Sequence, residues 1–250
     1  MRSRAVILFW AALTACARPA VEQPGATIAA RQELWSPTAT QPSSPHDGRA
    51  VVLPSGQVVV VSGAVCELFD PATEQWTAGP SPGAPQVSHV VSLWNGRAVT
   101  VSSSRAEALD GPGWTLLGPL QLSRQNSAAV PLPDGRLLLI GGEGAAGSEV
   151  ERLELDGGST LLATVAAVHL RHTATLLGDG TVVVLGPEAA ASRFDPVANA
   201  WTPLVSPGRA GHTASLLAGG ELLLVSDAGA ERYAPGSGAL TAVPGLHVPR

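Results

Sequence analysis

One pattern recurs along this chain and limits what it can fold into. The stretch "RHTATLLGDGTVVVLG" (residues 171–186) returns, altered, as "GHTASLLAGGELLLVS" (211–226) and "QNSAAVPLPDGRLLLIGG" (125–142). Each copy places a turn dipeptide between two apolar runs, which predicts a hairpin with a two-residue primed turn. Five such dipeptides occur: Ser55-Gly56, Asn95-Gly96, Asp134-Gly135, Asp179-Gly180 and Gly219-Gly220. Their second residues are 40, 39, 45 and 40 positions apart, and a period near forty is typical of propellers and solenoids.

The apolar run that follows each turn distinguishes a propeller from a solenoid or a membrane barrel. "QVVVVSG", "RLLLIGG", "TVVVLG" and "ELLLVS" are apolar without alternation, so we expect strands buried on both faces. A strand of an outer-membrane barrel alternates between lipid-facing and lumen-facing residues instead. Because the runs are short and joined by hairpin turns, a helical solenoid is excluded. Sheets packed face to face satisfy the pattern.

A second element follows each hairpin. Phe69 and Trp76 are seven residues apart in "ELFDPATEQW", and Phe194 and Trp201 have the same spacing in "SRFDPVANAW". "ERYAPGSGAL" repeats the spacing with Tyr233 and Leu240. The Asp-Pro pair after the aromatic residue predicts a turn, and the Trp then begins a fourth strand. Four strands per unit is the composition of a propeller blade.

The whole unit resembles the repeat of kelch and galactose-oxidase-like propellers over residues 46–246, with its apolar run, glycine doublet, aromatic residue and later Trp. The resemblance implies an all-β fold, a kelch-type β-propeller of four-stranded blades. Five complete units favour five blades. A six-bladed ring that lacks much of one blade is the alternative. "ELWSPT" (Glu33–Thr38) resembles an outer strand, which we expect to close the ring by joining or latching the last blade, because an open ring exposes strand edges.

The N-terminus reads as an export signal. Two Arg occur in the first four residues, an apolar run extends from Ala5 to Ala15, and Cys16 follows. "LTAC" resembles the lipobox of bacterial lipoproteins, which implies lipid attachment at Cys16. We therefore divide the chain into a lipoprotein signal peptide (1–16), a tether with one possible closing strand (17–45) and a β-propeller (46–250). The expected location is the bacterial cell envelope, at the outer membrane.

Cys66 is the second of two cysteines. Because it lies between apolar residues on an expected strand, we predict that it is buried as a small hydrophobic side chain. A disulfide with Cys16 is the alternative.

Charge and residue types exclude several functions. The net charge of −5 is scattered along the chain, so we expect no nucleic-acid partner, because neutralising phosphates requires clustered positive charge. Some galactose-oxidase-like propellers are copper radical oxidases, which require two Tyr, one of them cross-linked to Cys, and two His. This chain has one Tyr in total, which argues against that activity. We expect no cofactor, no metal and no catalytic residue.

Three His occupy matching places in their repeats: His172 and His212, with His89 close to the same register. They could line a channel and bind a metal, but a residue repeated in several blades more simply serves the contact between blades. Within "SEVERLELD" (148–156), Glu149, Glu151 and Glu154 alternate with apolar residues, which predicts a solvated edge strand.

The interval of 45 residues marks the one irregular unit. Its excess falls in "GGEGAAGSEV" (141–150), a loop expected to join the second and third strands of its blade. Since propellers carry function in loops that differ between blades, the candidate ligand-binding residues are Glu143, Glu149 and Arg152. The predicted function is a monomeric, non-enzymatic, lipid-anchored recognition module for a protein or carbohydrate. The alternatives are a hydrolase or lyase at the channel mouth, or a truncated propeller without function.

Overall fold

All regular structure in the described part of the chain is β-strand. The computed structural model describes residues 48–83, 89–92, 96–144, 149–154, 156–164, 172–186, 191–208, 211–226 and 229–244. The signal peptide, the lipobox, the tether and the proposed closing strand Glu33–Thr38 fall outside these ranges and stay predictions. No helix in the described ranges is suited by length and apolarity to cross a bilayer.

Five antiparallel sheets of four strands follow one another along the chain. Blade 1 contains β1 (Arg49–Val52), β2 (Val58–Ser62), β3 (Val65–Asp70) and β4 (Gln75–Ala78). Blade 2 contains β5 (His89–Ser92), β6 (Ala98–Val101), β7 (Arg105–Asp110) and β8 (Gly113–Pro119).

Blade 3 is the only one of the five interrupted by an extra pairing among the described residues. Its sheet contains β10 (Ala128–Pro131), β11 (Leu137–Ile140), β13 (Val150–Leu153) and β14 (Ser159–Leu161). A separate two-stranded ribbon joins β9 (Arg124–Gln125) to β12 (Glu143–Gly144).

Blades 4 and 5 return to the regular order. Blade 4 contains β15 (Thr173–Leu176), β16 (Val182–Leu185), β17 (Ala191–Asp195) and β18 (Ala200–Pro203). Blade 5 contains β19 (Thr213–Leu216), β20 (Leu222–Ser226), β21 (Gly229–Ala234) and β22 (Ala239–Val243).

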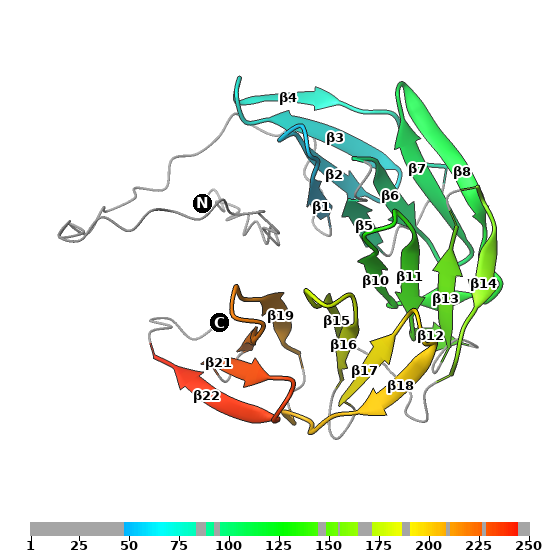
Figure 1. Cartoon of the computed structure of the whole chain (residues 1–250). Helices are drawn as coiled ribbons and strands as arrows, with labels where there is room; N and C mark the ends of the chain where they lie inside the picture. Colours follow the sequence, from blue (N-terminus) through cyan, green and yellow to red (C-terminus); the bar gives the residue numbers. More distant parts are fainter. Residues whose placement is uncertain are drawn as a thin grey trace, which may run out of the picture.

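The sheets stand side by side around a common axis, with the first strand of each blade innermost (Figure 1). Inner strands of successive blades contact one another, β1 with β5, β5 with β10, β10 with β15 and β15 with β19. The chain is thus a five-bladed β-propeller, and the prediction of an all-β fold with five four-stranded blades is confirmed. The first and last blades stand at the two ends of the arc (Figure 1).

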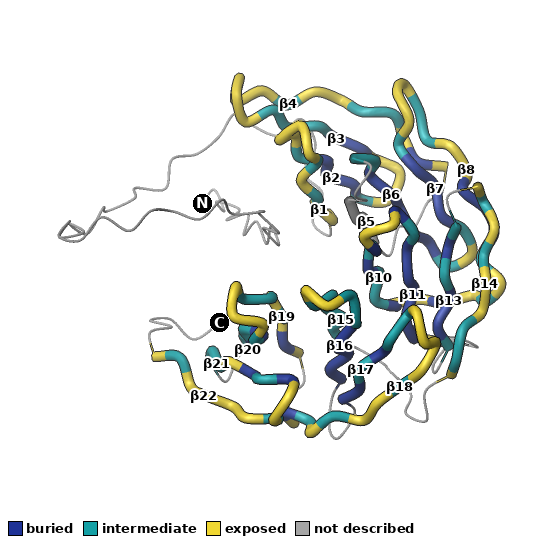
Figure 2. Tube along the Cα trace, in the orientation of Figure 1, coloured by how far each residue is buried: buried dark blue, intermediate teal, exposed yellow. Residues whose placement is uncertain are grey.

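The hydrophobic core is divided into clusters that lie between neighbouring blades. In blades 2, 3 and 4 the second strand supplies both of its flanking clusters because its alternate residues point to opposite faces. In β16, Val182 and Val184 pack against blade 3, whereas Val183 and Leu185 pack against blade 5. All four are 0% exposed. Figure 2 shows this buried layer in the middle of each blade, with the outer strands largely exposed. Burial on both faces is confirmed for β11 and β16 and is nearly complete for β2, whereas Leu223 and Val225 of β20 are only half-buried.

The hairpin turns differ from the prediction in their length. Leu132 N donates to Arg136 O and Gly135 N donates to Leu132 O, at 2.8 and 3.0 Å, so three residues form the turn. The glycine has a φ of 87° and the preceding Asp134 has no positive φ. This is a type I turn followed by a bulge glycine, and the same two bonds close the turns of blades 1, 4 and 5. The prediction of two-residue primed turns was therefore wrong for these four blades, although the glycine requirement was right. Asn95 of the turn in blade 2 lies outside the described residues.

Two local predictions are confirmed. Asp70 and Asp195 each cap the turn between the third and fourth strands by accepting a backbone N–H, from Ala72 and Val197 respectively, both at 2.9 Å. Cys66 is a free cysteine, 3% exposed, in the cluster between blades 1 and 2. Burial, with a smaller contribution from the neighbouring Glu67, raises the pKa of its thiol to about 11, which keeps it protonated and unreactive at neutral pH.

Candidate functional site

The irregular loop of blade 3 forms an ordered ribbon. In a four-stranded meander, the turn between strands one and two and the turn between strands three and four share one end of the blade. The linker entering the blade and the connection between strands two and three share the other. β9 belongs to that linker and β12 to that connection, and they pair through Gln125↔Glu143 and Arg124↔Gly144. The predicted excursion therefore joins strands two and three as expected, and it pairs with the linker.

Gly142 permits the close approach of the two segments. Its φ is 109°, and a Cβ at this position would lie 2.7 Å from the carbonyl oxygen of Gln125. A side chain would clash with this backbone atom and would also be strained at that φ. The glycine doublet Gly141-Gly142 survives only in this unit, which is the unit with the ribbon.

A buried ion pair holds the ribbon against the blade. Arg124 and Glu151 are joined through Nη2 and Oε2 at 2.9 Å, and both side chains are 0% exposed. Arg124 Nη1 lies within hydrogen-bonding reach of three carbonyl oxygens, at 3.2 to 3.4 Å, from Leu139, Gly141 and Glu149. Burial lowers the pKa of the guanidinium, and Glu151 opposes this shift.

The same pair fixes the linker from blade 2. Glu151 Oε1 accepts the backbone N–H of Gln121 at 2.6 Å, while the backbone N–H of Arg124 donates to Ser103 O in blade 2 at 2.9 Å. Since breaking a buried pair leaves an uncompensated charge, the ribbon, the linker and the third strand of blade 3 are held in one arrangement.

The ribbon presents a small polar surface. Glu143 is exposed on β12, and its Oε1 accepts a hydrogen bond from Asn126 Nδ2 at 3.1 Å. Asn126 follows β9 and has a φ of 53°, a left-handed conformation that Asn tolerates better than most residues. The two side chains from the two segments thus face each other at the ribbon.

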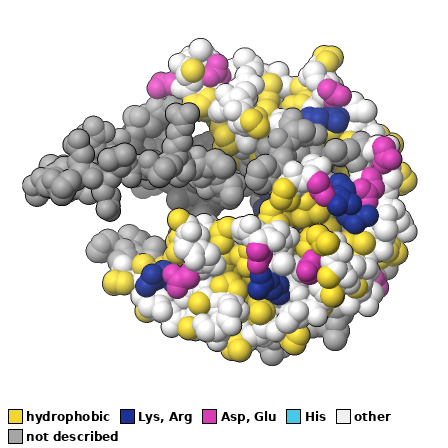
Figure 3. All heavy atoms as spheres, in the orientation of Figure 1, with side chains coloured by type: hydrophobic (Ala, Val, Ile, Leu, Met, Phe, Trp, Pro, Cys, Tyr) yellow, Lys and Arg dark blue, Asp and Glu magenta, His cyan; other side chains and the backbone are white. Residues whose placement is uncertain are grey.

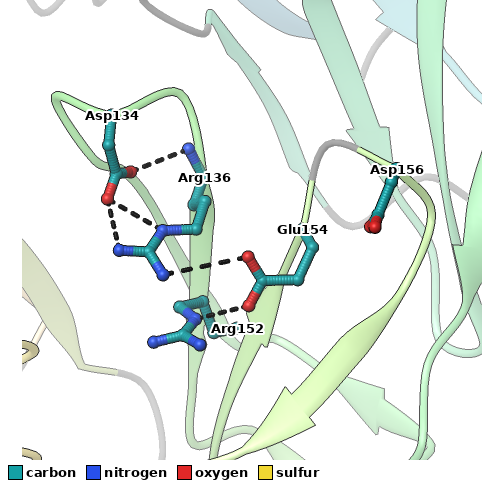
Figure 4. Close-up of a pocket in the computed structure, with 5 residues that line it drawn as sticks. All are labelled: Asp134, Arg136, Arg152, Glu154 and Asp156. Atoms are coloured by element: carbon teal, nitrogen blue, oxygen red, sulfur yellow. Dashed lines mark hydrogen bonds and ion pairs between the residues drawn. The ribbon is translucent and has the colours of Figure 1, made fainter.

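A depression of about 600 Å³ lies at the opposite end of blade 3, lined by Asp134, Arg136, Arg152, Glu154 and Asp156 (Figure 4). Arg136 bridges two carboxylates, binding Asp134 closely and Glu154 at 3.8 Å. Its side-chain hydrogen bond is the main reason that the pKa of Asp134 is lowered. Arg152 Nε donates to Glu154 Oε1 at 2.6 Å. The charges of this depression are therefore largely paired with one another.

The three candidate ligand residues do not form one site. Glu143 lies on the ribbon, and Glu149 is half-buried with its carbonyl oxygen directed to Arg124. Arg152 lies in the depression at the other end of the blade. Its place on the third strand is also a repeated one, since Arg193 and Arg232 pair with Asp179 and Glu221 at the turns of blades 4 and 5. The position of Arg152 thus recurs, although its partner is Glu154, two residues further along the chain, and not a residue of the turn.

The expectation of a solvated edge strand was wrong. β13 lies between β11 and β14, and Glu151 is fully buried because Arg124 neutralises it. The sequence offered one signal: Glu67, Glu107 and Glu231 stand at the same register position of their third strands. Arg124 lies 27 residues before Glu151, and its contribution was not predicted from the sequence. By spacing, Arg209 precedes His212 as Arg124 precedes Ser127, and residue 209 lies outside the described ranges.

The repeated histidines join neighbouring blades. His172 Nε2 lies 3.0 Å from the carbonyl oxygen of Ile140 in blade 3, and His212 Nε2 lies 3.0 Å from Thr173 Oγ1 in blade 4. This geometry agrees with the interpretation as blade contacts. Across the part of the chain that the structure describes, no three His, Cys, Asp or Glu side chains gather so as to hold a metal ion.

Solved structures show the same fold. A fungal alcohol oxidase of the AA5 family, in complex with copper, aligns with a TM-score of 0.62 and 18% identity over 76% of this chain and 50% of its own. Virginiamycin B lyase from Staphylococcus aureus aligns with a TM-score of 0.66 and 13% identity, over 83% of this chain and 73% of its own. A catalytically inactive variant of that lyase with quinupristin gives 0.63 and 13%, over 81% and 71%.

These likenesses show the fold, a β-propeller. Identities this low show the fold alone, and the chain spans half the length of the oxidase. No protein-family profile matches the sequence, and no curated protein matches it.

In the described part of the chain, the Tyr and the Cys that a copper radical site would join lie apart. The hydroxyl of Tyr233, the chain's one Tyr, donates to the carbonyl oxygen of Val205 at 2.6 Å, between blades 4 and 5. Burial raises its pKa. Cys66 lies between blades 1 and 2, so a cross-link between the two side chains does not fit this arrangement.

Proposed function

We propose that this chain is a lipid-anchored recognition module that binds a protein or carbohydrate without altering it. The ribbon of blade 3 is the binding element, and the observation that supports this proposal is the buried Arg124–Glu151 pair beneath it. A loop that is ordered before it meets its ligand loses less conformational entropy on binding. The ribbon is such a loop, and among the described residues it occurs in one blade of the five.

The exposed chemistry of the ribbon suits polar ligands. Glu143 offers an acceptor for a hydroxyl or an amide N–H, and Asn126 offers both a donor and an acceptor beside it. Sugar hydroxyls and peptide backbone groups can donate and accept such hydrogen bonds. On the face seen in Figure 3, acidic and basic side chains lie next to one another and form no large patch of one sign, which favours hydrogen bonding over long-range charge attraction as the means of recognition.

The kelch-type repeats and the lipid anchor in this proposal rest on the sequence. Membership of the kelch repeats is supported by the repeated units, and anchoring is supported by the lipobox at Cys16. A tether between residues 17 and 45 places the propeller away from the membrane. The ligand is then met at the surface of the cell envelope.

The test is a binding screen that also monitors the ligand. The chain and an N126A/E143Q variant are applied to an array of polysaccharides, and hits are titrated by calorimetry. We expect at least tenfold weaker binding by the variant, because two hydrogen bonds are lost. An E221Q variant serves as the matched control. Glu221 lies in blade 5, at the end of the blade opposite to the one that carries the ribbon in blade 3, so this variant should bind normally. Equal affinity of the ribbon variant would contradict the proposal.

The lyase neighbours favour one competing function, a lyase or hydrolase at the channel mouth. Mass spectrometry of the bound sugar after prolonged incubation separates the two. A ligand of unchanged mass supports recognition. A product with a new double bond or a hydrolysed linkage would contradict the recognition proposal and show that the protein is an enzyme.

A further inference from the structure

Three blades hold the preceding blade by the same kind of hydrogen bond. An aromatic side chain on the third or fourth strand donates to a carbonyl oxygen: Trp114 to Pro80 at 2.7 Å, Trp201 to Ala163 at 2.9 Å and Tyr233 to Val205 at 2.6 Å. Each acceptor is the second residue after the outer strand of the preceding blade, as β4, β14 and β18 end at Ala78, Leu161 and Pro203. The bond is a repeated clamp between blades.

Blade 1 contains the donor of this clamp without its acceptor. Trp76 lies 4.9 Å from Phe69 between ring centroids with planes at 41°, and Trp201 lies 4.9 Å from Phe194 at 43°. The two indoles therefore have the same pose. The Nε1 atom of Trp76 is buried and has no hydrogen-bond partner among the described residues. An unmade buried hydrogen bond is unfavourable, so an acceptor is expected at this place.

The face around Trp76 also has the shape of a blade contact. By register, Val58, Val60 and Phe69 of blade 1 occupy the positions of Val182, Val184 and Phe194 in blade 4. The blade 4 residues are 0% exposed against blade 3. In blade 1 Val60 is 7% exposed, and Val58 and Phe69 are only half-buried. No described strand precedes blade 1 to cover them.

One segment of the chain matches the missing neighbour. "LWSPTA" (34–39) aligns with "AWTPLV" (200–205), placing Trp35 on Trp201, Ser36 on Thr202 and Pro37 on Pro203. Ala39 then takes the place of the acceptor Val205. The distance along the chain also agrees: 14 residues separate Trp35 from the start of β1, and 12 separate Trp201 from the start of β19. Residues 34–39 lie outside the described ranges.

We propose that residues 34–39 pack on the free face of blade 1 as an outer strand, with the carbonyl oxygen of Ala39 accepting the hydrogen bond of Trp76. Glu74 supports this assignment. It occupies the place of Asn199, with φ values of 56° and 51°, and Asn199 Oδ1 accepts the backbone N–H of Ala163 at 2.8 Å. The carboxylate of Glu74 is thus placed to accept the N–H of Ala39. The segment meets the first blade and not the last, and this arrangement is independent of the recognition function.

Photo-crosslinking tests the position of the segment. Thr38 aligns with Leu204, which packs into the cluster between blades 4 and 5, so residue 38 should face blade 1. A benzoyl-phenylalanine replaces Thr38 in the full chain, and the same probe replaces Leu204 as a control. We expect intramolecular cross-links from position 38 to residues 58–76, and from position 204 to blade 5. Cross-links from position 38 to blade 5, to a second molecule or to nothing would overturn the proposal.

Hydrogen exchange tests the individual bond. Trp76→Phe retains an aromatic ring but removes the N–H donor, and Trp201→Phe does the same in blade 4. We expect peptides covering residues 34–40 to be protected in the unaltered chain and to exchange at least threefold faster in the Trp76 variant. The Trp201 variant should accelerate only the peptide around Ala163. Exchange of residues 34–40 at the rate of unstructured chain in the unaltered protein would refute the docking.

Discussion

At the scale of single residues, some side chains recur at the same position of several blades and others do not. His172 and His212 recur, and both were interpreted correctly because what every blade repeats is its contact with a neighbour. Glu151 also recurs in register, but its burial could not be predicted from alternation, since a carboxylate is normally placed on the solvent side. Its partner Arg124 lies on the linker that enters the blade, 27 residues earlier in the chain. The pairing is created by the fold and leaves no local pattern.

The Arg124–Glu151 pair gives the first stability prediction. Replacing Glu151 by Leu leaves the guanidinium buried without its carboxylate, so we expect a loss of about 3–5 kcal/mol in the free energy of unfolding. Replacing Arg124 by Met should cost a similar amount, and the double variant should cost clearly less than the two losses together. The measurement is urea unfolding followed by tryptophan fluorescence.

An exposed pair provides the control for that cycle. Arg232 and Glu221 are 45% and 35% exposed and lie 3.3 Å apart, so Glu221→Gln should cost less than about 1 kcal/mol. Equal costs for the buried and the exposed pair would show that burial of Arg124 does not determine the stability of the ribbon.

At the scale of elements, the sequence predicted strands and their order well but missed the exact form of the turns. The apolar runs indicated buried second strands because no other element of four or five residues hides both faces. The dipeptides indicated hairpins, yet Asp-Gly occurs both in two-residue turns and in turns with a bulge glycine. Which of the two turn types forms depends on which residue pair closes the turn, and the hydrophobic pattern does not specify that pair.

Adjacent glycines in blade 5 test the turn assignment. Gly220 has a φ of 83° while Gly219 has no positive φ, and a Cβ at either position would meet nothing within 4 Å. Gly220→Ala should therefore destabilise the protein by about 1–2 kcal/mol through backbone strain alone. Gly219→Ala should be neutral, or stabilising by about 0.4–1 kcal/mol because it restricts the unfolded chain. Thermal unfolding of the two variants gives the comparison, and equal losses would indicate a primed turn.

At the scale of the whole molecule, the propeller was predicted from three features together: the period near forty, the apolar runs after the turns and the four strands per unit. The function could not be predicted with the same precision, because a ligand is recognised by loops whose sequences vary independently of the blades. Of the three candidate residues, Glu143 alone is part of the ribbon surface. Asn126, on the partner segment, became visible only through the pairing of β9 with β12.

The lipid anchor at Cys16 gives a prediction for the whole molecule. If Cys16 is acylated, the protein purified from a bacterial membrane fraction should begin at Cys16 and carry lipid, as measured by intact-mass spectrometry. Cys16→Ser should release most of it into the soluble fraction, because a protein attached only by its acyl chains has no other hold on the bilayer. Cys66→Ser is the matched control and should stay in the membrane. An unmodified Cys16 in that fraction would disprove the anchor.

The division of the core into separate interblade clusters has a mechanical consequence. Each cluster joins only two neighbouring sheets, so a pulling force between the ends of the chain would load the blades one after another. Extension would proceed in steps of one repeat, each releasing roughly 140 Å of backbone for about forty residues. The propeller would then yield gradually under force, one blade at a time.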